Sequence, residues 1–109
     1  MSQITLPEPI AAYFAADVKG PDDVARCFTA TGVVKDKGHT HTGREAIKAW
    51  KAETSTLYTY TNEPRAVQLI DGVHVVSSHV VGSFPGSPID MKLLFRLERG
   101  LIAGLEFTV

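Results

Sequence analysis

The sequence predicts an α+β fold in which helices cover one face of a mostly antiparallel sheet. Before residue 58, apolar residues recur three and four positions apart, which is the spacing of an amphipathic helix. After it, segments rich in Val, Thr, Ile and Phe are separated by turn sequences such as Asp71-Gly72 and Arg99-Gly100. Helices followed by hairpin-linked strands are typical of this class, and we expect one domain over residues 1–109.

Two short helices are expected first. Prolines at 7 and 9 favour a helix start, and Lys19-Gly20 ends that helix, whose apolar face comprises Ile10, Tyr13, Phe14 and Val18. Pro21 begins the second helix, with acids in the first turn where the helix dipole favours them. Its apolar stripe comprises Val24, Cys27 and Phe28, and Thr31-Gly32 is expected to end it.

A short strand at residues 33–37 and a third helix are expected next. Thr42 and Glu45 have the spacing of a capping box, T-x-x-E, so the helix is expected to begin there. One side of this helix comprises Ile47, Trp50, Thr54 and Leu57. Four strands then follow, at 59–70, 73–84, 88–97 and 101–108. In the third of them every odd-numbered residue from 89 to 97 is apolar, which predicts its buried face.

Asp36 lies near the end of the short strand, where side chains alternate between two faces. If Lys35 and Lys37 take the solvent side, Asp36 shares the inner side with Val34. The opposite register would bury two ammonium groups in order to expose one carboxylate, which is costly. Asp36 is therefore expected to face the interior, although an aspartate here also fits a turn residue that accepts hydrogen bonds from the loop that follows.

Composition excludes several classes of protein. With a net charge of −1 and a hydrophobic fraction of 44%, the chain has the balance of an ordinary globular protein and no basic block for nucleic acid. Its single cysteine, Cys27, favours a reducing compartment. The N-terminus lacks the basic region of a signal peptide, and no apolar run reaches the roughly 18 residues of a membrane span. We therefore expect a cytoplasmic protein that binds neither nucleic acid nor membrane.

Three segments carry a family resemblance: AAYFAADVKGPDDVARCF, VKDKGHTHTGREAIKAW and SFPGSPIDMKLLFRLERGLIAGLEF. In these three segments the chain resembles the nuclear transport factor 2-like superfamily, and most closely its SnoaL-like and ketosteroid isomerase-like branches. The resemblance covers essentially the whole chain. It implies a cystatin-like, cone-shaped curved sheet wrapped around the N-terminal helices, with an apolar cavity at the open end.

The same resemblance implies catalytic residues. Isomerase-like members keep a general-base aspartate in a V-x-D strand, which corresponds to Asp36, and an oxyanion-binding tyrosine on the first helix, which corresponds to Tyr13. Their protonated carboxylic acid on a late strand corresponds to Leu93 here. Losing such a donor typically lowers the rate by about 10²–10³-fold, so steroid isomerisation itself is not expected. Tyr13 also fits a core side chain on an apolar helix face.

Other side chains are expected to line the cavity. His39 and His41 belong to a GHTHTG loop placed at its mouth, and Trp50 forms a wall. His74 and His79 are an odd number of residues apart on one strand, so only one faces inward, and the central His79 is favoured. The expected ligand-binding residues are Phe14, His39, His41, Trp50, His79 and Leu93.

His39, His41 and Glu45 match the first metal motif of the cupins. The second cupin motif needs a later histidine, and none follows His79. Two histidines without a convergent third ligand make a weak site, so we expect no metal and no cofactor.

Three functions are compatible with these expectations. The first is a SnoaL-like isomerase or polyketide cyclase-type enzyme that removes a proton next to a carbonyl of a small hydrophobic or aromatic molecule. The second is a module that binds such a molecule without turnover. The third is an adaptor. A homodimer is expected in each case, because strand residues such as Val75, Val80 or Val81 would leave an apolar outer sheet face.

Overall fold

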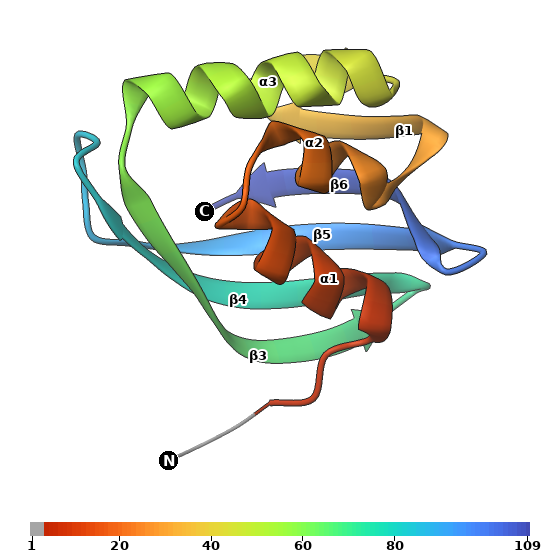
Figure 1. Cartoon of the computed structure of the whole chain (residues 1–109). Coiled ribbons are helices and arrows are strands. Elements are labelled where there is room, and N and C mark those ends of the chain that lie inside the picture. Colours follow the sequence, from red (N-terminus) through yellow and green to blue (C-terminus); the bar gives the residue numbers. More distant parts are fainter. Residues whose placement is uncertain (1–3) are drawn as a thin grey trace.

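The structure, a computed structural model, describes residues 4–109 and is built on one six-stranded sheet (Figure 1). The strand order is β2-β1-β6-β5-β4-β3. Every neighbouring pair is antiparallel except β1 and β6, which are parallel. The strands are β1 (Phe28–Asp36), β2 (His39–Thr42), β3 (Tyr60–Ile70), β4 (Val73–Gly82), β5 (Ile89–Glu98) and β6 (Leu101–Thr108).

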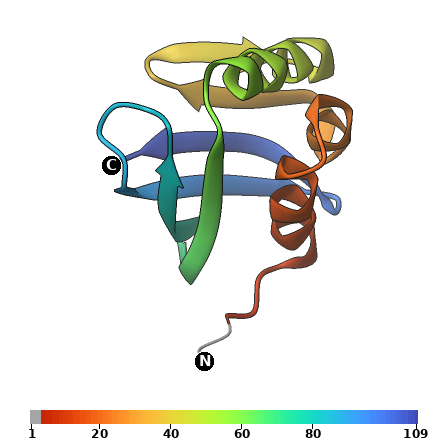
Figure 2. The same ribbon diagram turned by 60° about the vertical axis from the view of Figure 1, so that its left-hand side comes forward.

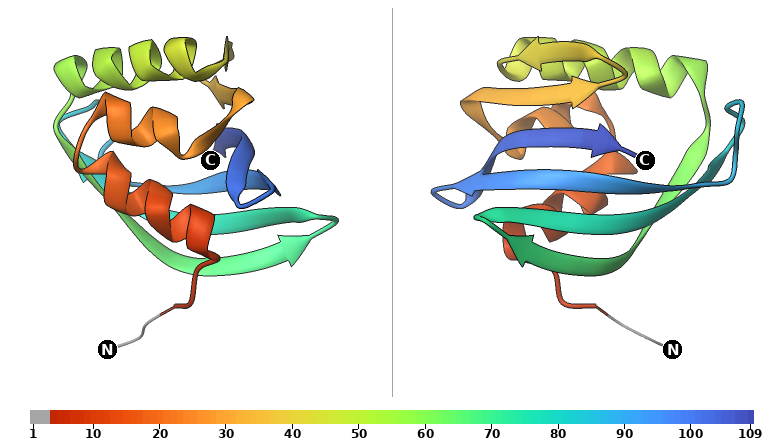
Figure 3. Two further views of the ribbon diagram at one scale, coloured as in Figure 1. Left: turned by 45° about the vertical axis from the view of Figure 1, so that its right-hand side comes forward. Right: turned by 180° about the vertical axis from the view of Figure 1, so that it is seen from behind.

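Three helices lie on the inner side of this bent sheet. Figure 2 shows α1 (Glu8–Asp17) and α2 (Pro21–Arg26) against its concave face, with α3 (Arg44–Leu57) across the β1 end. The view from behind in Figure 3 shows no helix over the outer face of β3 to β6. The predicted α+β class and the curved, mostly antiparallel sheet around the N-terminal helices are therefore confirmed.

The core fills the space between the helices and the sheet. Alternation along β4 and β5 sends every second side chain inward, and Val76, Leu93 and Phe95 are completely buried there. From the helices, Ile10, Tyr13, Val24 and Ile47 meet them. The odd-numbered face expected for the strand IDMKLLFRL is the buried face. No helix among residues 4–109 is long and apolar enough to cross a membrane.

The second helix is shorter than the sequence predicts. It ends at Arg26, and strand β1 already begins at Phe28. The backbone N–H of Ile102 donates to the carbonyl of Cys27 over 2.9 Å, so pairing with β6 takes the place of another helical turn. The ring of Phe28 packs beneath Gly32, where an added Cβ would lie only 3.0 Å from the Phe28 Cβ. Tertiary pairing thus overrides the local helical pattern.

The predicted capping box is also wrong. Thr42 is still part of β2 and pairs with Val33, and the GHTHTG segment is mostly strand rather than loop. Gly43 takes the N-cap position, with φ of 89° and without a side-chain cap hydrogen bond. This left-handed backbone favours glycine.

Two apolar residues expected on helix faces are exposed. Val18 is 84% exposed and Leu57 is 60% exposed. In the last turn of α1, the side chain turned inward is the neighbouring Asp17, only 6% exposed.

Candidate functional site

A cavity of about 410 Å³ opens beside α3 at the end of the sheet where β1 and β6 finish. Pockets of about 300–1,000 Å³ are typical of small-molecule sites. The polar groups on its wall include Asp36, Lys37, Tyr60 and Asn62. The remaining walls are largely aromatic and aliphatic, formed by Trp50, Thr54, Tyr58, Val80, Phe84, Pro85, Ile89, Met91 and Phe107.

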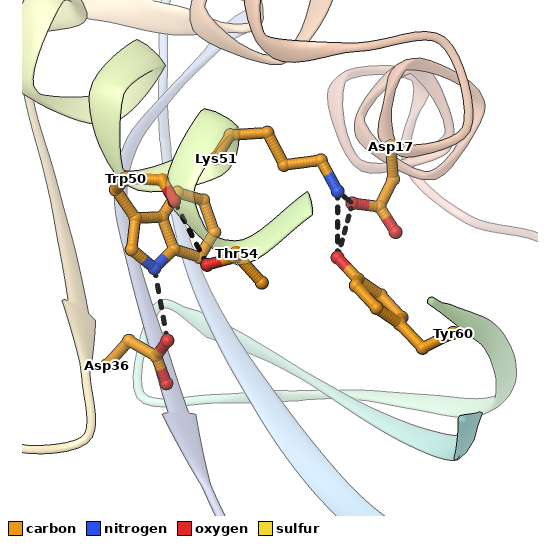
Figure 4. Close-up of polar contacts among 6 residues, drawn as sticks. All are labelled: Asp17, Asp36, Trp50, Lys51, Thr54 and Tyr60. Atoms are coloured by element: carbon orange, nitrogen blue, oxygen red, sulfur yellow. Dashed lines mark hydrogen bonds and ion pairs between the residues drawn. The ribbon is translucent and has the colours of Figure 1, made fainter. Parts of the chain in front are cut away.

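Asp36 supplies the carboxylate of this cavity. It is the last residue of β1, two positions after the buried Val34, so it takes the inner side by alternation. The indole N–H of Trp50 donates to its Oδ2 over 3.0 Å (Figure 4). Within residues 4–109 this is the one hydrogen bond formed by the carboxylate, and Oδ1 has no partner there. The ring of Trp50 packs in turn on Phe107, with centroids 5.7 Å apart.

A buried polar cluster stands behind another part of the wall. Lys51 Nζ donates to Asp17 Oδ1 over 2.7 Å and to the Tyr60 hydroxyl oxygen over 2.8 Å. The Tyr60 hydroxyl lies 3.2 Å from the same Asp17 oxygen (Figure 4). Only 3% of the Lys51 side chain and 6% of the Asp17 side chain are exposed. Tyr60 lines the cavity and thereby connects this cluster to it.

Burial and pairing set the protonation of this cluster. Burial by itself lowers the pKa of Lys51, but the hydrogen bonds to Asp17 and Tyr60 outweigh it, and the pKa is raised. Burial and the nearby Asp17 carboxylate raise the pKa of Tyr60, against the lowering effect of Lys51. At neutral pH the cluster is therefore an ammonium group paired with a carboxylate, next to a protonated phenol.

Asn62 is a further polar residue that lines the cavity. It lies two residues after Tyr60 on β3, on the same face of the strand. Its side-chain Oδ1 is buried and has no hydrogen-bond partner within residues 4–109. Buried polar atoms normally have a partner, and this oxygen is an exception within the described residues.

Three of the expected site residues belong to the core instead of the cavity wall. Tyr13 is 1% exposed, and its ring makes edge contacts with Phe14, Phe28 and Phe95. Burial raises the pKa of Tyr13 well above its usual value, with Asp17 adding to the effect. Leu93 is completely buried. Neither these two residues nor Phe14 is among the residues that line the cavity.

The four histidines lie in four different places. His41 lies on β2 behind Trp50, with ring centroids 6.2 Å apart, and His39 is exposed beside Asp36 in a smaller hollow of about 220 Å³. His79 was expected to face inward, and this is wrong, because its Nδ1 lies 2.8 Å from the exposed Asp90 on the outer face. His74 shares the inner face with Val76, and its Nδ1 is buried.

Metal-ligating side chains do not converge in the described part of the chain. No three His, Cys, Asp or Glu side chains of residues 4–109 could hold an ion together. Glu45 is exposed on α3 and does not join His39 and His41.

Sequence reasoning missed Lys51, Asp17, Tyr60 and Asn62. Lys51 could have been found, because it stands four residues after Ile47 and one after Trp50, and so shares the buried helix face by spacing. Tyr60 and Asn62 alternate at the start of a strand, which marks two polar side chains on one face. Asp17 had no such signal, because its partner is 34 residues away in the sequence.

Comparisons with known proteins agree with this architecture. No protein-family model matches the sequence, and no curated protein matches it. Among solved structures, a protein described as a candidate polyketide cyclase from Sinorhizobium meliloti is 33% identical, with a TM-score of 0.89. The match covers 94% of this chain and 95% of that chain.

Two further structures extend the comparison. A protein with a ketosteroid isomerase-like fold from Catenulispora acidiphila, solved in complex with trimethylamine, is 26% identical over 96% of this chain and 87% of that chain, with a TM-score of 0.84. A nuclear transport factor 2-like protein from Cytophaga hutchinsonii is 13% identical over 97% of this chain and 90% of that chain, with a TM-score of 0.74, which concerns the fold alone. The chain belongs to the nuclear transport factor 2-like superfamily, and its fold is of the cyclase and isomerase kind.

Proposed function

We propose that the protein is an isomerase or cyclase-type enzyme that removes a proton next to a carbonyl group of a small hydrophobic or aromatic molecule. The observation that carries this proposal is Asp36. It is the carboxylate of a largely apolar, aromatic cavity, with Oδ2 fixed by Trp50 and Oδ1 left to a ligand. A general base must reach the proton that it removes, and a fixed carboxylate on the cavity wall meets that requirement.

The reaction needs only groups that the chain supplies. Asp36 Oδ1 takes a proton from the carbon next to the carbonyl, and the electron pair of that C–H bond forms a carbon–carbon double bond. The carbonyl oxygen then carries the negative charge of an enolate. If the substrate also has a carbon–carbon double bond conjugated with the enolate, return of the proton from Asp36 to the far end of that system gives an isomer. If the enolate carbon attacks a second carbonyl in the molecule, a ring forms, and the resulting alkoxide takes the proton from Asp36.

Proton removal can be tested without knowing the natural substrate. The probe is 2-tetralone, a bicyclic aromatic ketone, whose α-protons are followed by proton NMR in D₂O. We expect the wild-type protein to accelerate loss of these signals, and Asp36→Asn to reduce the rate to that of buffer. The matched control is Asp90→Asn, because Asp90 is exposed on the outer face, away from the cavity. An Asp36→Asn variant as fast as wild type would refute the proposal.

Binding without turnover is the second candidate, and the aromatic wall beside Asp36 supports it. Trp50, Tyr58, Phe84 and Phe107 line the same cavity as the carboxylate, and aromatic faces next to a negative charge suit an alkylammonium ion. The similar protein with a ketosteroid isomerase-like fold was solved with trimethylamine. Calorimetry with trimethylammonium chloride, and with tert-butanol as a neutral molecule of similar shape, tests this. Binding of the cation alone, without exchange of 2-tetralone, would favour this candidate.

The cytoplasm is the location we propose. Cys27, half-buried and without a disulfide, is compatible with a reducing compartment.

A further inference from the structure

Two adjacent residues of α3 form hydrogen bonds to residues on two different walls of the cavity. Trp50 reaches Asp36 at the end of β1, and Lys51 reaches Tyr60 at the start of β3 (Figure 4). Successive helix positions point about 100° apart, so one turn of α3 supports both groups at once. Asp36 and Tyr60 line the same cavity. The cavity wall therefore includes a carboxylate and a phenol, and each is held by a hydrogen bond from α3.

The hydrogen bonds of Tyr60 allow its proton to turn toward a ligand. A phenol has one proton to donate and lone pairs to accept with. Lys51 donates to the Tyr60 oxygen over 2.8 Å, so this bond does not use the phenolic proton. Tyr60 donates that proton to Asp17 Oδ1 over 3.2 Å, the longest contact of the cluster. If it turns away, Asp17 still accepts from Lys51 over 2.7 Å.

We propose that Tyr60 donates its hydroxyl proton in a hydrogen bond to the carbonyl oxygen of a ligand in the cavity, and that Lys51 and Asp17 are positioning residues for it. This rests on the proposed function in one respect, which is that the ligand carries a carbonyl group. When Asp36 removes the neighbouring proton, the negative charge develops on that carbonyl oxygen. Tyr60 stabilises it there, in the role that the family resemblance implies for Tyr13.

The surroundings of the three tyrosines favour Tyr60. Tyr13 lies among phenylalanine rings outside the cavity wall. Tyr58 does line the cavity, but its ring faces the Lys37 ammonium, 5.1 Å from the centroid, and Phe84. Tyr60 alone of the three has its hydroxyl bonded by a cation within residues 4–109. An ammonium group on the phenol oxygen makes the phenol a stronger donor.

The charge states are consistent with these roles. The raised pKa of Tyr60, caused first by burial and then by Asp17, keeps its proton in place at neutral pH. The pKa of Lys51 is raised as well, because its bonds to Asp17 and Tyr60 outweigh burial. Lys51 therefore stays an ammonium group, which suits positioning and excludes attack on a carbonyl as a free amine.

The carbonyl stretch of bound 2-tetralone, labelled with ¹³C at the carbonyl carbon, reports this hydrogen bond directly. Infrared difference spectra are compared for wild type and the three variants Tyr60→Phe, Tyr58→Phe and Tyr13→Phe. We expect Tyr60→Phe to move the stretch to higher frequency and to slow exchange by about 10²–10³-fold, the usual cost of one oxyanion donor. The other two variants should have smaller effects. Equal frequencies in wild type and Tyr60→Phe, or a larger shift in Tyr13→Phe, would overturn the proposal.

The Asp36→Asn protein separates this proposal from the proposed function. If it loses exchange but keeps the low carbonyl frequency, both proposals are supported. If wild type shows no exchange but its carbonyl frequency still depends on Tyr60, proton removal fails and the hydrogen bond stands. Exchange in wild type that Tyr60→Phe leaves unchanged overturns the role of Tyr60 alone. Absence of any bound carbonyl band in wild type overturns both.

The positioning role of Lys51 needs a variant that folds. Removing Lys51 alone would leave Asp17 as a buried, unpaired carboxylate, so the double variant Asp17→Asn/Lys51→Met removes both charges together. Circular dichroism verifies its fold. We expect its carbonyl frequency to lie between those of wild type and Tyr60→Phe, because the phenol remains but the ammonium on its oxygen is gone. A frequency equal to that of wild type would show that Lys51 has only a structural role.

Discussion

The indole N–H of Trp50 donates a 3.0 Å hydrogen bond to Asp36 across the space between α3 and β1. This bond ties the carboxylate to the same helix turn that holds Tyr60 through Lys51. The spacing between the two walls of the cavity thus depends on α3, which is packed into the core through Ile47.

Replacing Trp50 with Phe should slow the exchange of 2-tetralone by about tenfold or more, because a hydrogen bond to a charged group contributes about 1.5–3 kcal/mol. The aromatic wall remains, so kcat should fall more than KM rises. Phe107→Leu is the comparison, since it trims the ring that packs on Trp50 without touching the bond to Asp36. It should alter KM in preference to kcat. Steady-state kinetics in which Trp50→Phe keeps the wild-type kcat would contradict this role.

Replacing Lys51 with Met should lower the free energy of unfolding by about 3–5 kcal/mol, because it leaves a buried carboxylate without its partner. The measurement is urea denaturation at pH 7. Lys48→Met is the matched control, because Lys48 pairs with Asp22 at an exposed position and surface pairs contribute little. Equal unfolding midpoints for the two variants would contradict the buried ion pair.

Alkaline pH should destabilise the protein. The pKa values of Tyr13 and Tyr60 are raised mainly by burial, and that of Lys51 by its partners against the effect of burial. The unfolded chain therefore loses these protons first, from about pH 10 upward. Since it then binds fewer protons than the folded chain, stability falls as pH rises.

Urea denaturation between pH 9 and 11.5 measures this dependence. Tyr13→Phe removes one of the three groups, so its stability should fall less steeply with pH than that of wild type. A slope unchanged by this substitution would show that Tyr13 does not contribute.

A homodimer through the outer sheet face remains our proposal. Val75 and Val81 lie on that face of β4, and Val81 is 43% exposed. Val80 was expected on the same face, but this is wrong, because Val80 is only 7% exposed and lines the cavity on the inner side. Light scattering at micromolar concentration should give twice the chain mass, and Val81→Glu should give the monomer mass. Leu57→Glu, at an exposed position on α3, is the control. A monomeric wild type would disprove the proposal.

Protein purified without a histidine tag should carry no stoichiometric metal at His39 and His41, because two histidines without a third ligand bind weakly. Metal analysis by mass spectrometry measures this. One equivalent of zinc or iron, lost in a His39→Ala/His41→Ala variant, would reverse the expectation.

Local pattern in the sequence determined most of the fold. The alternation of β5 fixed which residues are buried, because a strand has two faces and only one of them was apolar. Turn sequences placed the four later strands to within two residues. Alternation along β1, together with the cost of burying two lysines, predicted that the side chain of Asp36 points inward. In the structure Asp36 lines the cavity. These features depend on neighbours in the chain, which the sequence displays directly.

Only the tertiary structure decided which side chains meet. His74 and His79 lie on opposite faces of β4, and alternation does not tell which of them points inward. That depends on which face of the strand the curved sheet turns toward the helices. Phe28 begins strand β1 instead of continuing the helix, because the backbone N–H of Ile102 on β6 donates to the carbonyl of the preceding Cys27. Tyr13 lies in the core, whereas Tyr60 lies on the cavity wall. Lys51 on α3 bonds both the Tyr60 hydroxyl and Asp17 on α1. Such contacts join residues far apart in sequence, and their energy depends on burial that local patterns do not encode.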